Sequence, residues 1–316
     1  MDTVPLPSAV RRTCARYPAG RPALVPGPRW RAVGQAASAA TCPSRPESVQ
    51  WAAVNLLATV VKSIWWHSGE DVRPEPQLRL PTGDVELVVN LSADRFWLPG
   101  GDEGREHYPG AVLAGPYQRA YVLRPERRSQ VVGVVLRPGA ARSLVGASLH
   151  ELRNRHVGLD ELWGADASLL RERLLAAPGP VARLRTLEHV LHDRVARSGR
   201  TPHRLAVRAT ACLSATPGRH GIGDLAEHLG WTARRVEQVF RSEVGLPPKV
   251  YQRLRRFRVA LGKLGGQTPD WSAFALEHGY SDQAHLVREF RAHSGLTPVD
   301  YVRRRGEQLN HVPLAW

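Results

Sequence analysis

The chain has 316 residues, of which 42% are hydrophobic and 23% are charged, and this ordinary globular balance excludes a chain that is disordered throughout. It carries 44 Lys and Arg against 29 Asp and Glu, so we expect an anionic partner, either nucleic acid or an acidic membrane surface. The sequence has no run of 18 uncharged apolar residues and no apolar segment ahead of a cleavage site, which predicts a cytoplasmic protein without a membrane span.

Residues 1–50 are the first predicted unit, a flexible arm rich in Arg, Pro and Ala. They hold seven Arg against Asp2 and Glu47, and their apolar residues follow neither the period of a strand nor that of a helix. Two interpretations stay open for this arm. It adds contacts to phosphates, or it is an extension without a role, and composition alone favours the second.

Residues 51–164 are predicted to form a β-rich regulatory domain. Runs rich in Val and Leu alternate with Gly, Pro and Asp, which is typical of short strands joined by turns. The predicted strands are residues 85–91, 111–114, 119–123 and 130–136. Such strands indicate an antiparallel sandwich or barrel. Trp65, Trp66 and Trp97 either line a ligand pocket of this domain or belong to its core, and core is the default.

Residues 165–200 are predicted to be a helical linker or dimerisation segment. Shortly before it, Ser148 followed three residues later by Glu151 predicts a capping box. Apolar residues then recur at the spacing of two amphipathic helices, as Leu169, Leu170, Leu174, Val181, Leu184, Leu187, Val190 and Leu191. These stripes must be buried against their own domain or a second subunit, and we slightly favour the second subunit.

The residues of this middle region do not form a catalytic or metal-binding pattern. Its histidines lie in no H-x-H or H-E-x-x-H spacing, and His189 with His192 is read as a solvated helix face. Cys14, Cys42 and Cys212 are far apart and match no zinc-ligand spacing. We therefore expect no metal, no cofactor and no enzymatic activity.

An internal repeat in the last third of the chain is the strongest signal in the sequence. Residues 225–253 and 274–304 match at an offset of 49, which becomes 50 after one inserted residue. Each copy has the parts of a helix-turn-helix unit: a small residue in the first helix, a glycine that ends it, and Thr232 or Ser281 to cap the second helix. The predicted structural residues are Ala226, Gly230, Phe240, Gly245, Pro248 and Tyr251 in the first copy, and Ala275, Gly279, Phe290, Gly295, Pro298 and Tyr301 in the second.

The second helix of each copy, which we call its reading helix, has an apolar and a polar face. Val236, Val239 and Phe240 are expected to point inward in the first copy, and the polar face of the second copy is expected to include Glu289. Residues 249–264 predict one helix that joins the copies. Such a connector can hold the two reading helices about one DNA turn, roughly 34 Å, apart.

Residues 206–305 resemble the DNA-binding domain of the AraC/XylS family of transcription regulators, through LAEHLGWTARRVEQVFRSEVGLPPKVYQRLRRFRVAL and GYSDQAHLVREFRAHSGLTPVDYVRR. The segment LRPGAARSLVGASLHELRNRHVGLDELWG is similar to an N-terminal domain of some members. The resemblance implies a seven-helix domain with two units in successive major-groove segments. It assigns base-facing positions to Arg234, Glu237, Gln238, Gln283, Ala284, His285 and Arg288. Candidate contacts to the DNA backbone are Arg235, Lys249, Arg253, Arg256, Arg303 and Arg304. Two positions depart from the family. Ala284 stands where the family often has a polar residue, and Glu237 places an acid at a position that faces the groove of the DNA.

The overall expectation is an α+β chain: a β-rich sensor-like domain, an all-α double helix-turn-helix domain at residues 201–305, and a tail at residues 306–316. The expected function is a sequence-specific transcription regulator, an activator or a repressor, that acts on promoter DNA in the bacterial cytoplasm and nucleoid. RNA polymerase, a small-molecule effector and a second copy of the chain are further candidate partners. A DNA repair or modification protein is the alternative, but it would need a reactive cysteine in a fixed motif. A non-specific binder is a third class, and the ordered repeat argues against it.

Overall fold

The computed structural model describes residues 47–51, 55–69, 75–98, 106–125, 129–217, 221–265, 269–306 and 308–314. Most of the predicted arm therefore lies outside the described residues. Its last residues differ from the expectation, because strand β1 (Glu47–Trp51) begins inside the segment assigned to the arm and pairs with β2. The predicted boundary of the arm at residue 50 is therefore corrected to residue 46.

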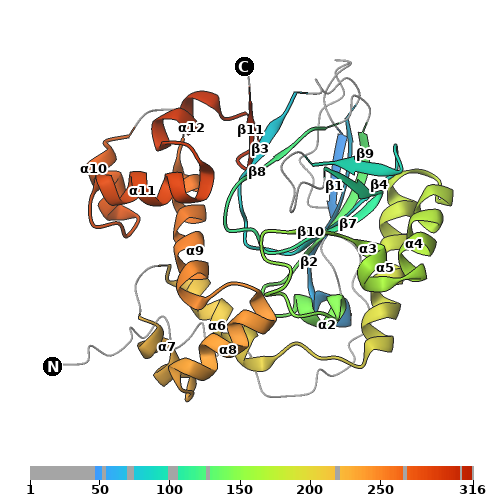
Figure 1. The fold of residues 1–316 in the computed structure, drawn as a ribbon, viewed down its shortest axis with the longest axis horizontal. Coiled ribbons are helices and arrows are strands. Elements are labelled where there is room, and N and C mark those ends of the chain that lie inside the picture. Colours follow the sequence, from blue (N-terminus) through green and yellow to red (C-terminus); the bar gives the residue numbers. More distant parts are fainter. Residues whose placement is uncertain are drawn as a thin grey trace.

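The N-terminal half is built on an antiparallel six-stranded sheet, which includes the strands predicted at residues 85–91, 111–114 and 130–136 (Figure 1). The strand predicted at residues 119–123 belongs to a separate three-stranded sheet. The strand order is β1, β2, β9, β4, β7, β10, formed by β1 with β2 (Val61–Gly69), β9 (Ser129–Leu136), β4 (Glu86–Asn90), β7 (Ala111–Ala114) and β10 (His156–Gly158). Central strands β4 and β9 carry long Val and Leu runs because both of their faces are covered. A separate two-stranded ribbon consists of β5 (Arg95–Trp97) and β6 (His107–Pro109).

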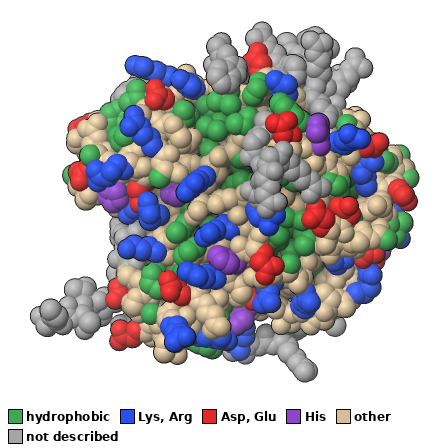
Figure 2. Space-filling model, in the orientation of Figure 1, with side chains coloured by type: hydrophobic (Ala, Val, Ile, Leu, Met, Phe, Trp, Pro, Cys, Tyr) green, Lys and Arg blue, Asp and Glu red, His purple; other side chains and the backbone are tan. Residues whose placement is uncertain are grey.

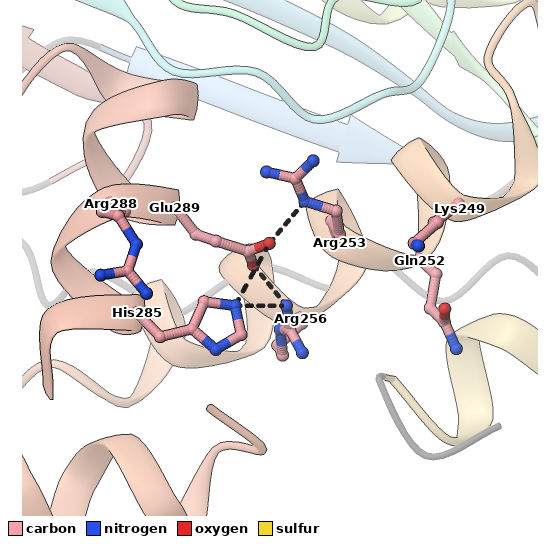
Figure 3. A pocket seen from close by; sticks show the side chains of 7 residues that line it. All are labelled: Lys249, Gln252, Arg253, Arg256, His285, Arg288 and Glu289. Carbon is pink, nitrogen blue, oxygen red and sulfur yellow. Dashed lines mark hydrogen bonds and ion pairs between the residues drawn. The ribbon is translucent and has the colours of Figure 1, made fainter. Parts of the chain in front are cut away.

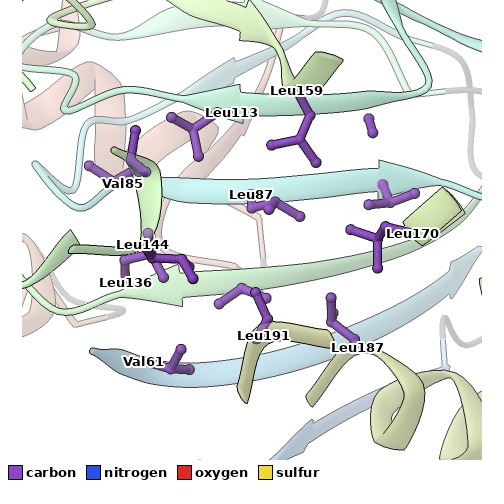
Figure 4. Packing of buried hydrophobic residues seen from close by; sticks show 14 of the residues in the cluster. Val61, Val85, Leu87, Leu113, Leu136, Leu144, Leu159, Leu170, Leu187 and Leu191 are labelled. Atoms are coloured by element: carbon purple, nitrogen blue, oxygen red, sulfur yellow. The ribbon is translucent and has the colours of Figure 1, made fainter. Parts of the chain in front are cut away.

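Helices cover one face of this sheet and close its core (Figures 1 and 4). They are the short helices η1 (Asn55–Thr59), α2 (Ala141–Val145) and α3 (Leu159–Trp163), followed by α4 (Ala165–Ala176) and α5 (Gly179–Ser198). The apolar stripe of α4 and α5, including Leu170, Leu187 and Leu191, is buried against Leu87 and its neighbours on the sheet. The apolar stripes are thus covered by the chain's own sheet. Their burial gives no argument for dimerisation, and the expectation that a second subunit covers them is corrected. Leu169 and Val181 were predicted to belong to these stripes, but both are exposed, and the prediction is wrong for these two residues.

No helix follows the predicted capping box. Residues 148–154 form successive turns, with the backbone N–H of Glu151 donating to the carbonyl of Ser148. A single Ser-x-x-Glu match is common by chance, and here it lacks the apolar periodicity that must follow it in a helix.

Seven helices form the C-terminal half within the described residues, which agrees with the resemblance. They are α6 (Arg204–Ala215), α7 (Ile222–Leu229), α8 (Ala233–Val244), α9 (Pro248–Lys263), α10 (Trp271–Glu277), α11 (Gln283–Ser294) and α12 (Pro298–Arg304). The connector α9 runs between the two helix-turn-helix units, one at each of its ends (Figure 1). Its apolar side chains Leu254, Phe257 and Leu261 are fully buried, as the period predicted.

The predicted tail, residues 306–316, is corrected in part by strand β11 (His311–Pro313). This strand pairs antiparallel with β3 (Gln77–Arg79), which in turn pairs with β8 (Tyr121–Leu123). Val312 is fully buried there. A three-residue strand whose partner lies more than 200 residues earlier has no local sequence pattern, and only the tertiary structure reveals it.

The two halves of the chain share one hydrophobic cluster. Leu80, next to β3, packs with Leu246, Leu254 and Val312 in the core of the C-terminal helices. A Cβ atom at Gly83, which has a φ of +74°, would lie 2.6 Å from Cδ2 of Leu254. The contact between the halves is therefore as tightly packed as a domain interior.

Candidate nucleic-acid interface

The first helix-turn-helix unit consists of α7 and α8. Ala226 is buried where the two helices meet, and Gly230 ends α7 in the left-handed conformation, with a φ of +71°. The Thr232 side chain accepts a hydrogen bond from the backbone N–H of Arg235 and so caps α8. The inward face of α8 holds Val236 and Phe240, both fully buried. Each of these roles follows the sequence prediction.

The second unit, α10 and α11, repeats this arrangement with one correction. Ala275 is buried and Gly279 has a φ of +77°, but the cap of α11 is Asp282 and not Ser281. The Asp282 carboxylate accepts from the backbone N–H of His285 at 2.7 Å, and this bond holds the pKa of the carboxyl below its ordinary value. Thr232 and Asp282 match at the offset of 50, so Ser281 is the inserted residue of the repeat. It donates to the cap from outside the helix.

The outward faces of the reading helices are open to solvent. Of the predicted base-facing residues, Arg234, Glu237, Gln238, Gln283, Ala284 and Arg288 are exposed. His285 is half-buried, and its Nδ1 lies 3.1 Å from the Ser281 hydroxyl. These side chains present amide, guanidinium and carboxylate groups at the surface of two helices in one chain. Groups of this kind can pair with the donors and acceptors on base edges.

Glu289 does not lie on the outward face, in contrast to the prediction from the sequence. Only 5% of its side chain is exposed, and its two oxygens each accept a hydrogen bond from an arginine of α9 (Figure 3). Arg253 Nε and Arg256 Nη2 both lie 2.5 Å from the carboxylate. Burial alone would raise the pKa of Glu289, but the hydrogen bonds and charges of Arg256 and Arg253 bring this pKa below its ordinary value. The position matches Val239, which is buried in the first unit, so the polarity of Glu289, and not the helical period, assigned its face wrongly.

Arg256 is the most enclosed of the candidate backbone contacts. Its guanidinium also donates to the carbonyl of Gly279 at 2.9 Å and lies over the Tyr280 ring at 4.6 Å. Arg256 therefore joins α9 to the turn of the second unit. The other candidates, Arg235, Lys249, Arg253, Arg303 and Arg304, are exposed. Arg235 donates to Gln238 at 3.0 Å.

A groove of about 600 Å³ lies between α9 and α11 (Figure 3). It is lined by Lys249, Gln252, Arg253, Arg256, His285, Arg288 and Glu289. Its walls therefore carry four Lys and Arg side chains and one acidic side chain. Figure 2 shows Lys and Arg side chains gathered along the side of the molecule that carries α8, α9 and α11. The groove and the two exposed helix faces form one basic surface.

Comparison with known proteins agrees with this geometry. A model of a helix-turn-helix domain family matches residues 225–304. The HTH-type transcriptional activator AarP of Providencia stuartii is 31% identical over 83 residues, 26% of this chain. The residues that the family model matches include the repeat, the glycine turns and both reading helices. Residues 225–304 are thus a helix-turn-helix domain of the type found in AraC/XylS transcription regulators. The match spans 62% of the AarP sequence, less than two thirds of that relative.

The N-terminal half of the chain matches a different model. Residues 51–158 correspond to a domain of unknown function, DUF6597. Solved structures of ToxT from Vibrio cholerae are also similar in part. One covers 82% of this chain and 96% of ToxT at 8% identity and a TM-score of 0.37. Another, of ToxT with a bound unsaturated fatty acid, covers 84% and 97% at 11% identity and a TM-score of 0.36.

Two of the three tryptophans that the sequence singled out have different surroundings. Trp66 belongs to the sheet core, whereas the Trp97 ring lies 4.4 Å from the Arg124 guanidinium. In the described ranges, no three His, Cys, Asp or Glu side chains come together as metal ligands would. None of the helices described there has the length and apolar character that a membrane crossing requires.

Proposed function

We propose that this protein is a transcription regulator of the AraC/XylS type that binds promoter DNA sequence-specifically through α8 and α11. The observation that carries the proposal is the pairing, in one chain, of two helices whose inward faces are buried and whose outward faces carry base-reading groups. A protein that used charge alone would not need this order. AarP is named a transcriptional activator, which supports the same class of function.

The outward residues suggest which bases each helix prefers. Arg234 and Arg288 are suited to guanine, which offers two acceptors in the major groove, and Gln238 and Gln283 are suited to adenine. Glu237 is suited to a cytosine amine. Arg235, Lys249, Arg253, Arg303 and Arg304 would neutralise phosphates on either side, which fixes the register without reading sequence.

The N-terminal domain is proposed to control the DNA-binding half, by sensing a ligand or by pairing subunits. Support comes from the cluster that the two halves share, since a change in the sheet near Leu80 would reach Leu254 of α9 directly. RNA polymerase is the proposed partner at the promoter.

The test is a selection from random duplexes with the full-length protein, followed by titration of the best duplex and a scrambled duplex at several salt concentrations. We expect the selected site to bind about a thousandfold or more tightly than the scrambled one, with a similar salt dependence for both duplexes. Equal affinities would show a non-specific binder and contradict the proposal.

A further inference from the structure

The N-terminal domain holds both helix-turn-helix units at the same position of the repeat. The contacted side chains are Glu243, near the end of α8, and His293, near the end of α11. Each lies two residues before the glycine that ends its helix, Gly245 or Gly295, and the two match at the offset of 50. The contacts therefore constrain the two reading helices at equivalent ends, although by different groups.

The first unit is held through side chain, backbone and close packing. Arg142 of α2 donates to the carboxylate of Glu243 at 2.5 Å, and only 9% of that carboxylate side chain is exposed. The backbone N–H of Leu149 donates to the carbonyl of Ser242 at 3.0 Å. A Cβ atom at Gly245 would lie 2.5 Å both from the Leu149 carbonyl oxygen and from Cγ of Pro116. The approach thus needs glycine at this helix end.

The second unit is held mainly by backbone groups of the loop between β7 and β8. His293 Nδ1 donates to the carbonyl of Gln118 at 2.8 Å, and the N–H of Ala120 donates to the carbonyl of His293 at 2.8 Å. His293 is buried and its ring packs near the Phe257 ring, with centroids 5.1 Å apart. Two bonds to one residue fix the end of α11 in both position and direction.

The two points of contact are tied together inside the N-terminal domain. The Gln118 N–H donates to the Asn154 side-chain oxygen at 2.8 Å, and the Gly115 N–H donates to the carbonyl of Arg155 at 2.9 Å. Asn154 has a φ of +55°, a left-handed conformation that Asn tolerates better than most residues. Residues 115–120, residues 148–155 and Arg142 therefore act as one piece, which we call the bracket.

We propose that the bracket positions the two reading helices relative to each other, so that Arg142 and the Gln118–His293 pair determine which spacing of two half-sites the protein accepts. This inference rests on the proposed function. The hydrogen bonds given above join the bracket to the C-terminal ends of α8 and α11, and the outward residues Arg234, Gln238 and Arg288 are exposed. The bracket restrains the reading surface without covering it. The connector α9 fixes the length between the units, and the bracket adds the restraint on their orientation.

The experiment uses the full-length protein and its selected duplex, altered by inserting or deleting one to five base pairs between the two half-sites. The bracket variant carries Arg142→Ala and His293→Phe, which remove one ion pair and one hydrogen bond but keep an aromatic ring at position 293. The matched control carries Arg173→Ala and His192→Phe, the same chemical changes at exposed positions on α4 and α5. Thermal melting identifies variants that remain folded, and Glu243→Gln replaces the bracket variant if that one does not fold.

For the wild type and the control we expect about a tenfold loss of affinity or more when a few base pairs are inserted or deleted, because a pre-organised pair of helices tolerates one spacing. For the bracket variant we expect weaker binding at the best spacing and about a threefold loss or less at the others. An unchanged spacing profile at uniformly lower affinity would overturn the inference and leave the proposed function intact. A wild type that selects no sequence would instead overturn the proposed function, and the inference with it.

Discussion

Arg256 and Glu289 form an ion pair of 2.5 Å that joins the connector helix to the second reading helix, and 11% and 5% of their side chains are exposed. The first unit has Val239 at the position of Glu289, packed against Leu205 and Ala206. The two units are thus attached to the rest of the domain by different chemistry, the first by apolar packing and the second by a buried charge cluster. The cluster also removes Arg256 from the set of cations that are free to meet phosphate.

Glu289→Gln should lower the free energy of unfolding by about 3 kcal/mol, because it leaves the largely buried guanidinium of Arg256 beside a neutral side chain. Chemical denaturation of the purified protein measures this change. Glu237→Gln is the matched control at an exposed position of α8, and it should change the stability by less than about 0.5 kcal/mol. Equal effects of the two substitutions would show that the cluster does not stabilise the domain.

Gly279→Val should destabilise the protein by about 2 kcal/mol through backbone strain. A Cβ atom there would have ordinary contacts, 3.8 Å from Cδ of Arg256, so the cost comes from the φ of +77° and not from a clash. Gly279→Asn should cost clearly less, since Asn adopts this conformation more readily. Gly262→Ala, inside α9 with open space around it, should be stabilising. Melting temperatures of the three variants test the order, and a Val variant as stable as the wild type contradicts it.

Arg288→Ala and Lys249→Ala should weaken DNA binding in different ways. Loss of a base contact at Arg288 should cost about 1–3 kcal/mol on the selected duplex and relax the preference at one or two base pairs. Loss of a phosphate contact at Lys249 should weaken selected and scrambled duplexes equally and reduce the slope of affinity against salt by about one. Affinities on both duplexes, measured across salt concentrations, distinguish the two roles.

Val312→Ala should destabilise the whole chain by about 2 kcal/mol, since Val312 is fully buried in the cluster that the two halves share. Leu309→Ala provides the control, because the Leu309 side chain is exposed and only a small effect is expected. The measurement is urea denaturation followed by circular dichroism. An effect no larger than that of Leu309→Ala would mean that β11 is not anchored in solution.

Stability should fall as the pH is lowered from about 6.5 to 5. Burial lowers the pKa of His156 to about 4, and burial together with the Arg79 charge lowers the pKa of His311 to about 3. The folded state therefore binds fewer protons than the unfolded state in this window, and each histidine contributes a loss of about 1 kcal/mol per pH unit. Above pH 7 both are neutral in either state, and their contribution is constant.

Denaturation at pH 7, 6 and 5 measures this slope. His156→Phe should reduce the slope of stability against pH by the contribution of one histidine. His192→Phe, at an exposed position, should leave this slope unchanged. A slope that is the same in all three proteins would contradict the assignment to His156.

The sequence by itself determined the elements whose causes are local. The glycine turns at Gly230 and Gly279, the helical period of α9 and the buried stripe of the first reading helix each depend on residues within a few turns of one another. For the same reason three strands of the N-terminal sheet, β4, β7 and β9, were predicted from Val and Leu runs between turn residues, whereas β1, β2 and β10 were not. An inserted residue was also visible in the repeat, but the sequence assigned the cap to Ser281, and only the backbone geometry showed that it is Asp282.

Only the tertiary structure decided what depends on partners distant in the chain. Glu289 faces inward because Arg253 and Arg256 of another helix compensate its charge, and helical period cannot show that compensation. β11 exists because β3 offers an unpaired edge, and the bracket exists because loops of the sheet meet the ends of α8 and α11. The apolar stripes of α4 and α5 were evident in the sequence, but their covering by the chain's own sheet was not, since an apolar face specifies burial and not the surface that buries it.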